Sequence, residues 1–285
     1  MFKSFSRKSI RRFILLLSVV LLTASVAIFG SLQKVNAASV HLTMGNPSFA
    51  STSTANSNNY LLEKAQYALS YNNSTRIPNW VSWQLNRSWL GSAPRQDDFR
   101  ADTTLPSGFY RVTTSDYTGS GFDRGHMTPS ADRTNTVANN SATFLMTNII
   151  PQAPDNNQGP WAVLEGYCRD LVNQGRELYI ISGAYGTGGS GSNGSASSIG
   201  PSIRVPARTW KVIVVLNTPG SGVSGVTTNT RVIAVNMPNS QGIRNNDWRS
   251  YRVTVDSIEG NTGYNFLSSV PTATQNVIEA RVDNQ

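Results

Sequence analysis

The tetrapeptide Asp-Arg-Gly-His at positions 123–126 holds the residue types best suited to chemistry in this 285-residue chain. Histidine transfers protons near neutral pH, and the chain has only two, of which His41 lies in a polar segment near the N-terminus. In an extended segment, residues i and i+2 project to the same side, so Arg124 and His126 can face one site. Gly125 between them lets a backbone or a ligand approach closely. A lone histidine is more often structural than catalytic, and these neighbours make His126 a candidate base.

A second group of polar residues begins at Asn148 and continues through Asp-Asn-Asn-Gln-Gly-Pro-Trp at 155–161 into an expected helix over 160–174. A proline in its first turn and a glycine just after its end are typical helix boundaries. At about 100° per residue, Glu165 and Arg169 lie together at the edge of an apolar stripe and can face a common cleft. The alternative is an ion pair on a solvated helix face, worth a few tenths of a kcal/mol.

Three other features carry weaker signals. Cys168, the only cysteine, lies on the apolar stripe, and we expect it to be a buried packing residue because a catalytic thiolate needs a base and exposure. Trp248 could stack on a nucleobase, but packing is the stronger expectation. The glycine-rich segment 186–200 formally matches a dinucleotide-binding fingerprint. We reject the match, since no helix can follow it and the expected acidic residue is missing, and we expect a flexible surface loop.

The polar motifs, in this order and spacing, resemble those of a known family. Asp-Arg-Gly-His, followed about 30 residues later by Asn-Gln-Gly-Pro-Trp and then by a Leu-Glu helix, is similar to the non-specific DNA/RNA endonucleases of the ββα-metal (His-Me finger) type. That family includes the Serratia nuclease, endonuclease G and the secreted, sugar-non-specific nuclease of cyanobacteria. The resemblance runs from about Trp80 to the C-terminus. It implies an α+β fold with a central, mostly antiparallel sheet flanked by helices.

The resemblance also implies a role for each matching residue. His126 would be the general base, and Asn157 would be the direct protein ligand of a divalent metal ion, Mg²⁺ in the first place, with Mn²⁺ or another divalent cation as a substitute. Glu165 would reach the metal through water, and Asn148 would be an amide that supports His126. Three arginines would bind substrate phosphate: Arg95, Arg124 and Arg169. The other two residues of the tetrapeptide would have structural roles.

These residue types fit the hydrolysis of a phosphodiester. A neutral imidazole can take a proton from an attacking water that lies within about 3 Å, and Mg²⁺ prefers oxygen ligands and can stabilise the leaving 3′ oxygen. Because nothing in this scheme uses the 2′-hydroxyl, DNA and RNA, single- or double-stranded, should both be substrates. By resemblance the products would carry 5′-phosphate ends, and an inhibitor protein is a partner to consider.

Apolar runs predict the elements that must position these residues. Five runs indicate strands: 80–85, 144–150, 177–182, 209–216 and 230–235. Their continuity predicts a central sheet that is buried on both faces. Apolar residues at 61–69 form one amphipathic face. We therefore expect a nuclease domain at 60–285, preceded by a polar, flexible leader at 38–59.

The N-terminus predicts export. Residues 1–37 combine a basic start, an apolar run from Phe13 to Phe29 and small residues near position 37, as in a cleaved secretory signal. An uncleaved anchor helix is the alternative, because the run approaches the ~18 residues that span a bilayer. Six of the eight net positive charges lie in this segment, so the remainder predicts local arginine contacts and no broad basic face. We expect a secreted or periplasmic protein without stable membrane association after cleavage.

Other functions stay open on the sequence alone. A secreted protein that captures nucleic acid without cutting it would share the arginines and the export signal. A phosphodiesterase for small esters would share the site. A serine hydrolase is disfavoured because the chain contains no Gly-x-Ser-x-Gly sequence.

Overall fold

The computed structural model describes residues 39–285, and Ser39–Gln285 form one compact unit. The secretory signal expected at 1–37 lies outside the described residues. From Ser39 onward, no helix is both long and apolar enough to cross a membrane.

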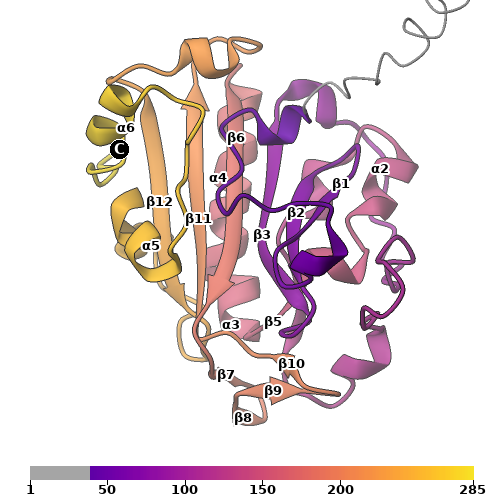
Figure 1. The fold of residues 1–285 in the computed structure, drawn as a ribbon. Helices are drawn as coiled ribbons and strands as arrows, with labels where there is room; N and C mark the ends of the chain where they lie inside the picture. Colours follow the sequence, from indigo (N-terminus) through magenta and orange to yellow (C-terminus); the bar gives the residue numbers. More distant parts are fainter. Residues whose placement is uncertain (1–38) are drawn as a thin grey trace, which may run out of the picture. The chain divides into compact units, whose positions relative to one another are not determined.

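A seven-stranded sheet forms the centre of this unit (Figure 1). All neighbouring strands in it pair antiparallel, and helices lie on both sides, so the expected α+β architecture is confirmed. From one edge to the other the strands are β1 (Tyr60–Glu63), β2 (Ala68–Asn72), β3 (Ile77–Leu85), β6 (Glu177–Tyr185), β11 (Arg208–Leu216), β12 (Arg231–Pro238) and β13 (Arg252–Val253).

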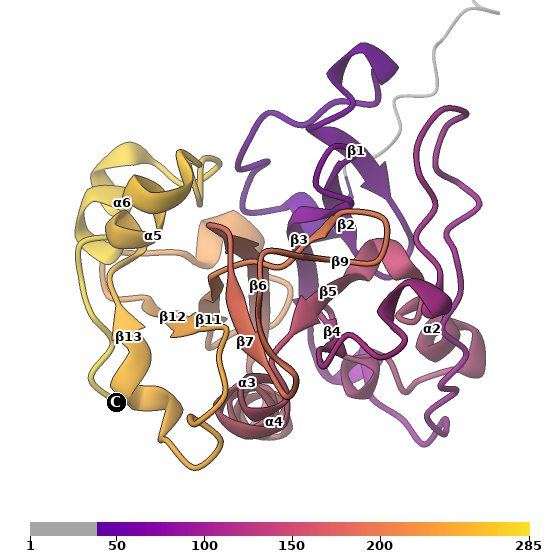
Figure 2. The same cartoon turned by 90° about the horizontal axis from the view of Figure 1, so that it is seen from below.

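Both faces of the sheet are buried, and each faces its own hydrophobic core. Successive side chains of a strand point to opposite faces, so on β11 Val212 and Val214 enter one core while Ile213 and Val215 enter the other. The first core contains α5 (Val255–Thr262) and α6 (Thr272–Ile278), and the second contains α4 (Ala162–Asn173). Figure 2 shows these helices on opposite sides of the sheet. This double burial explains why the central strands are almost continuously apolar.

The remaining elements are short. A two-stranded sheet of β4 (Asp123–His126) and β5 (Ile149–Gln152) lies on the α4 side. Segment 186–207 contains short strands and no helix. This agrees with our rejection of a dinucleotide-binding fingerprint there, because that fingerprint requires a helix. The other elements are α2 (Val137–Ala142), α3 (Pro154–Asn156), β7 (Gly189–Gly191), β8 (Gly194–Ala196), β9 (Ser198–Ile199) and β10 (Ile203–Arg204).

Three of the five expected strands lie within β6, β11 and β3, and the run at 230–235 begins one residue before β12. The strand expected at 144–150 was wrong over most of its length, because residues 146–148 form a 3₁₀ turn, Leu145 makes only an isolated bridge with Arg100, and the strand ladder begins at Ile149. The Asn148 side chain in this turn bonds to backbone groups, which competes with a strand ladder. The apolar residues at 61–69 lie on the β1–β2 hairpin.

Residues 39–59 are not a loose leader, and the domain does not start at Tyr60. Met44 and Ala50 are buried in the core on the α5 side of the sheet. The Asn46 side chain closes a local turn by accepting from Ala50 N at 2.9 Å and donating to Ala50 O at 2.9 Å. The polar composition of this segment predicted a flexible leader. The segment is nevertheless packed, because two buried apolar residues and hydrogen bonds to side-chain amides are enough to hold it.

His41, in the same segment, is a buried neutral histidine with 2% of its surface exposed. Its Nε2 lies 2.9 Å from Ala65 O, and its Nδ1 accepts from Gln84 N at 3.2 Å. Only the neutral ring satisfies both contacts, because protonated Nδ1 would face another donor. Burial, with a smaller contribution from the positive charge of Arg133, lowers the pKa of His41 to about 4.

Replacing His41 should make the stability less dependent on pH. A histidine pKa that is lower in the folded state contributes stability above the unfolded value of 6.5, and that stability is lost as the pH falls toward 4. Between pH 7.5 and 4.5 the wild type should lose about 2–3 kcal/mol more unfolding free energy than His41→Gln. Urea unfolding at both pH values measures this difference, and equal losses would contradict it.

Candidate active site

The β4–β5 hairpin carries the Asp-Arg-Gly-His sequence along one strand. His126 pairs with Ile149, and Gly125 pairs with Ile150. A side chain at Gly125 would overlap the buried side chain of Gln152. Glycine is therefore required here by the close packing of the strand against Gln152.

An open, polar pocket of about 630 Å³ lies beside this hairpin. Among its lining residues are three of the predicted site residues: Arg95, Arg124 and Asn157. The acidic residue of the tetrapeptide, Asp123, lines it as well. A larger pocket of about 750 Å³, near the C-terminal end of α4, contains none of the predicted site residues.

Asn157 follows α3 at the start of an irregular turn of π-helix, Asn157–Trp161. Gly159 has non-helical backbone angles in this turn, and Pro160 supplies no backbone N–H. A side chain at Gly159 would overlap the backbone of Arg244. The sequence Asn-Gln-Gly-Pro-Trp therefore builds a break before α4, and single-turn π-bulges of this kind occur frequently at functional sites.

The amide of Asn157 is oriented by a carboxylate. Its Nδ2 donates to Asp123 Oδ2 at 2.8 Å, and the neighbouring Gln158 Nε2 donates to the same oxygen at 2.7 Å. None of residues 39–285 donates a hydrogen bond to Asn157 Oδ1, so this oxygen is available to a ligand in the pocket. Sequence reasoning missed this orienting role of Asp123, although an acid in the tetrapeptide was a visible signal.

His126 is 9% exposed and lies against two phenylalanine rings. The centroid of its ring is 5.3 Å from that of Phe99, which lines the pocket, and 4.9 Å from that of Phe144. Burial lowers the pKa of His126 to about 3, with smaller contributions from the charges of Arg95 and Arg124. The ring is therefore neutral at physiological pH, which is the state a general base requires.

The two nitrogens of His126 are not equivalent. Nε2 is enclosed and has no hydrogen-bond partner within the described part of the chain. Nδ1 also makes no hydrogen bond to residues 39–285, but it is not fully enclosed. In a neutral ring one nitrogen carries the proton and the other accepts. Nδ1 is therefore the nitrogen better placed to take a proton, although His126 itself does not line the 630 Å³ pocket and meets it through Phe99.

The two pocket arginines are placed by aromatic rings. The guanidinium of Arg124 lies over Phe99, 4.1 Å from the ring centroid, and forms no ion pair with any described acid. Arg95 lies over Phe144 at 4.8 Å and donates to Ser130 Oγ at 2.8 Å. Arg95 also pairs with Asp97 at 3.3 Å, but both side chains are exposed, so this pair is weak. Both guanidinium groups can bind an anion in the pocket.

Glu165 and Arg169 lie in a separate cluster of charges on α4. Lys211 Nζ is 3.2 Å from Glu165 Oε1, and Arg169 Nη1 is 2.9 Å from Asp132 Oδ1. Neither lines the 630 Å³ pocket, and they do not pair with each other among the described residues. Burial raises the pKa of Glu165, and the charge of Lys211 opposes this shift.

Lys211 is a residue that sequence reasoning missed. It is 1% exposed in its side chain, and its ammonium lies 3.7 Å from the centroid of the Trp161 ring. A buried lysine requires a partner, and Glu165 supplies it. The signal was a lone lysine inside the apolar run 209–216.

Asn148 acts on the backbone and does not reach the imidazole. Its Oδ1 accepts from Thr128 N at 2.9 Å, and its Nδ2 donates to Thr128 O and Thr143 O, both at 2.9 Å. The side chain is fully buried. It therefore fixes the chain two residues beyond His126, which makes it a positioning residue. Cys168 and Trp248 are 2% and 1% exposed and pack in the core, as expected.

Comparison with known proteins identifies the family. The family model described as DNA/RNA non-specific endonuclease matches residues 44–273, which includes every predicted site residue. The chain belongs to this family. It is 58% identical over 246 residues to a nuclease of Nostoc sp. (strain PCC 7120), covering 86% of this chain and 87% of the relative. The match from Met44 also agrees with the packed N-terminal segment.

More distant relatives of this endonuclease include mitochondrial proteins. Nuclease EXOG of Xenopus laevis is 32% identical over 208 residues, which cover 70% of this chain and 56% of the relative. Human endonuclease G is 37% identical over 125 residues, 43% of this chain and 42% of the relative. A solved structure described as the EndoG/EndoGI complex has a TM-score of 0.67 at 25% identity and covers 82% of this chain and 92% of that one.

Endonucleases of this type depend on a divalent metal ion, and the pocket residues fit such an ion. The free Oδ1 of Asn157 and the carboxylate of Asp123 are hard oxygen donors in one pocket. Mg²⁺ and Mn²⁺ bind oxygen donors and retain several waters, so few protein ligands are needed. Asn157 is the residue that would hold the ion, with Asp123 orienting its amide.

Proposed function

We propose that this nuclease is an exported, Mg²⁺-dependent endonuclease that cuts both DNA and RNA and leaves 5′-phosphate ends. The observation that supports it best is the neutral ring of His126, which packs against Phe99 at a pocket lined by two arginines and by Asn157 with its free amide oxygen. A base, cations and a metal-binding oxygen are the groups that hydrolysis of an anionic diester requires. Mn²⁺ or another divalent cation could replace Mg²⁺.

His126 Nδ1 would take the proton from water as that water attacks the phosphorus. Arg124 and Arg95 would hold the phosphate oxygens and offset the negative charge that builds on them. Asp123 would keep Asn157 Oδ1 turned into the pocket. A Mg²⁺ ion bound there would stabilise the charge on the departing 3′ oxygen. Departure of the 3′ oxygen leaves the phosphate on the 5′ end.

None of these steps requires a 2′-hydroxyl, so both sugars should be accepted. The roles proposed for Glu165 and Arg169 have less support from the structure. Lys211 pairs with Glu165, and Asp132 pairs with Arg169. Glu165 would reach the metal through water, and Arg169 would reach phosphate with the guanidinium nitrogens that Asp132 leaves free. Asn148 would act only through the backbone that it fixes.

Digestion of polymer with and without chelator tests the function. Plasmid DNA, single-stranded DNA and RNA should each be cut in Mg²⁺ and stay intact in EDTA, and excess Mg²⁺ should restore cutting. End-labelling should find 5′-phosphates. A nitrophenyl phosphodiester cut as fast as polymer would favour the small-ester enzyme, and binding without cutting in every tube would favour a capture protein.

Export and inhibition are further parts of the proposal. The mature protein should be found outside the cytoplasm, with an N-terminus near position 38, whereas an intact N-terminus in the membrane fraction would indicate an anchor. The solved EndoG/EndoGI structure is described as showing a mechanism of EndoG inhibition. A protein inhibitor of this nuclease is therefore a partner to seek, by affinity capture followed by an inhibition assay.

Arg124→Ala should weaken nucleic-acid binding and its dependence on salt. Arg124 has no acidic partner within residues 39–285, so its whole charge is available to phosphate. Removing one phosphate contact lowers the slope of log Kd against log salt by about one. Fluorescence anisotropy in EDTA, which prevents cutting, measures it. Arg100→Ala is the control, since Arg100 pairs with Asp98 and lies outside the pocket; an equal change in both slopes would contradict the role of Arg124.

A further inference from the structure

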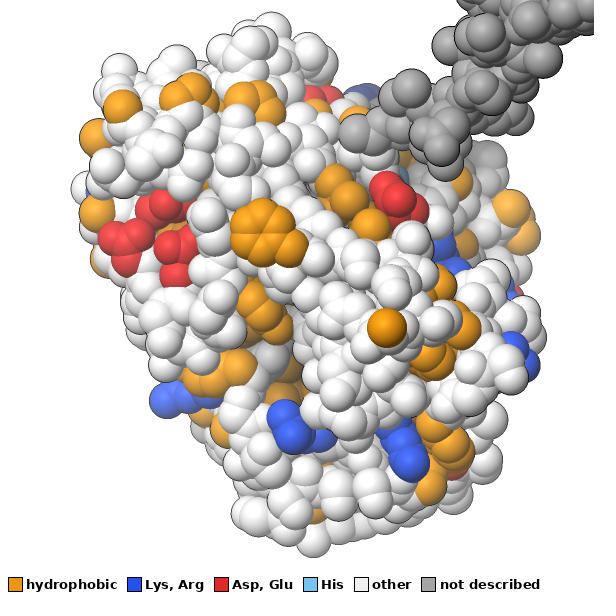
Figure 3. Space-filling model, in the orientation of Figure 1, with side chains coloured by type: hydrophobic (Ala, Val, Ile, Leu, Met, Phe, Trp, Pro, Cys, Tyr) orange, Lys and Arg blue, Asp and Glu red, His pale blue; other side chains and the backbone are white. Residues whose placement is uncertain are grey.

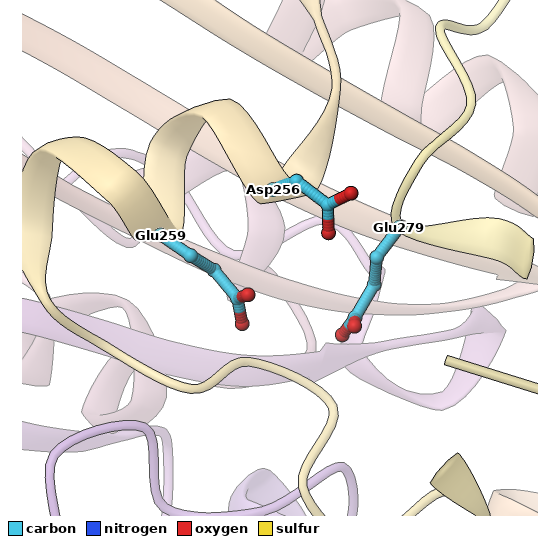
Figure 4. Close-up of side chains that lie close together, drawn as sticks. All are labelled: Asp256, Glu259 and Glu279. Atoms are coloured by element: carbon cyan, nitrogen blue, oxygen red, sulfur yellow. The ribbon is translucent and has the colours of Figure 1, made fainter. Parts of the chain in front are cut away.

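Three carboxylates meet on the side of the sheet opposite to the active site. Asp256 and Glu259 lie on α5, and Glu279 follows the last turn of α6. One oxygen of each lies within 4.8 Å of the other two. Figure 4 shows the three carboxylates directed toward a common space, and Figure 3 shows acidic side chains gathered over this part of the surface.

Glu279 is the unusual member of the group. It is only 5% exposed, and its Oε1 is enclosed and has no hydrogen-bond partner within the described chain. Its backbone is fixed, because its carbonyl oxygen accepts from Asp256 N at 3.2 Å. A buried carboxylate oxygen without a partner is costly, so a ligand for it is to be expected.

The cluster also has no counter-ion within the part of the chain that the structure describes. No lysine, arginine or histidine of residues 39–285 forms an ion pair with any of the three acids. Burial and the nearby charges of Glu259 and Asp256 raise the pKa of Glu279 to about 8. Burial also raises the pKa of Glu259, although the N–H of Phe266 donates to it. The three groups therefore repel one another when they are ionised.

We propose that Asp256, Glu259 and Glu279 bind one divalent cation, Ca²⁺ by preference, and that this ion joins α5 to the end of α6. Ca²⁺ takes six to eight oxygen ligands at about 2.3–2.6 Å, so oxygens around one ion lie up to about 5 Å apart. The observed separations lie within this limit. Mg²⁺ requires a stricter geometry and binds carboxylate cages less readily.

The ion would be structural, not catalytic. α5 and α6 pack in one core, while α4 packs in the core on the opposite face of the sheet. Ca²⁺ binding to the folded state alone should raise the unfolding temperature. Because a metal ion in the active site would do the same, the test needs a protein that lacks Asn157.

The experiment compares thermal unfolding of Asn157→Ala and of Asn157→Ala/Glu279→Gln at pH 8.5, after removal of metal with EGTA and dialysis. Addition of about 5 mM CaCl₂ should raise the melting temperature of the first by about 3 °C or more and leave the second unchanged. Without Ca²⁺ the second should melt at the same or a higher temperature, because one repelling charge is gone. Calorimetric titration should find one Ca²⁺ site in the first protein and none in the second.

Two further variants complete the design. Glu63→Gln, an exposed acid without an ion pair in residues 39–285, should keep the whole Ca²⁺ shift in the Asn157→Ala background. Asp256→Asn tests the site at an exposed position in case Glu279→Gln fails to fold. No shift in Asn157→Ala, or an equal shift after loss of Glu279 or Asp256, would overturn the proposal. MgCl₂ in place of CaCl₂ should give the smaller shift.

Discussion

His126→Ala is expected to reduce cleavage of DNA and RNA by at least 10²–10⁴-fold, because general-base catalysis contributes about this much. The substitution removes a neutral ring beside the pocket, but it leaves the arginines and Asn157 in place. DNA affinity and metal affinity should therefore stay within a few-fold of the wild type. Single-turnover rates in saturating Mg²⁺, with anisotropy for binding, separate the two effects.

The other histidine provides the matched control. His41→Gln also replaces a buried neutral imidazole, but its contacts are to Ala65 and Gln84 near the N-terminal segment. It should cut at the wild-type rate at pH 8. If His126→Ala kept its activity, or if it lost activity and DNA binding together, His126 would not be the base.

Asn157→Ala is expected to lower metal affinity and the rate of cleavage by 100-fold or more. Removing a group that hydrogen-bonds to a metal ligand typically lowers metal affinity or activity 10–100-fold. Asn157 Oδ1 is the proposed ligand itself, so its loss should have the larger effect. Asp123→Asn should lower metal affinity and the cleavage rate by the smaller factor of 10–100, because it disturbs the hydrogen bond that orients the Asn157 amide. Cleavage rates measured across a Mg²⁺ titration should show the Asp123→Asn defect partly restored at high Mg²⁺.

Gln158 allows a close comparison with Asn157. It is the next residue, also an amide, and donates to the same Asp123 oxygen at 2.7 Å, but it does not line the pocket. Gln158→Ala should therefore keep most of the activity and an unchanged Mg²⁺ midpoint. Equal Mg²⁺ midpoints for Asn157→Ala and the wild type would sink the ligand assignment.

The sequence could predict the central sheet and the types of residue at the site. Both came from short-range signals: continuous apolar runs in β6 and β11, and the spacing of Asp-Arg-Gly-His from Asn-Gln-Gly-Pro-Trp. Such patterns fix which residues can do chemistry, and the structure brings Arg95, Arg124 and Asn157 to one pocket.

The partners of these residues could not be predicted in the same way. Glu165 on α4 meets Lys211 on β11, 46 positions away, because α4 packs against the face of the sheet that Lys211 shares with Ile213 and Val215. No local periodicity encodes that neighbour. The N-terminal segment was missed for a related reason, since Met44 and Ala50 are buried by residues far along the chain, and composition alone describes such a segment as loose.

Phe99 has a consequence for how this enzyme can change over evolution. Its ring lies against the imidazole of His126 and also beneath the guanidinium of Arg124. A different side chain at this position would disturb proton acceptance and anion capture at once. Natural selection therefore cannot tune these two tasks separately through Phe99, and variation that adapts one of them must arise elsewhere around the pocket.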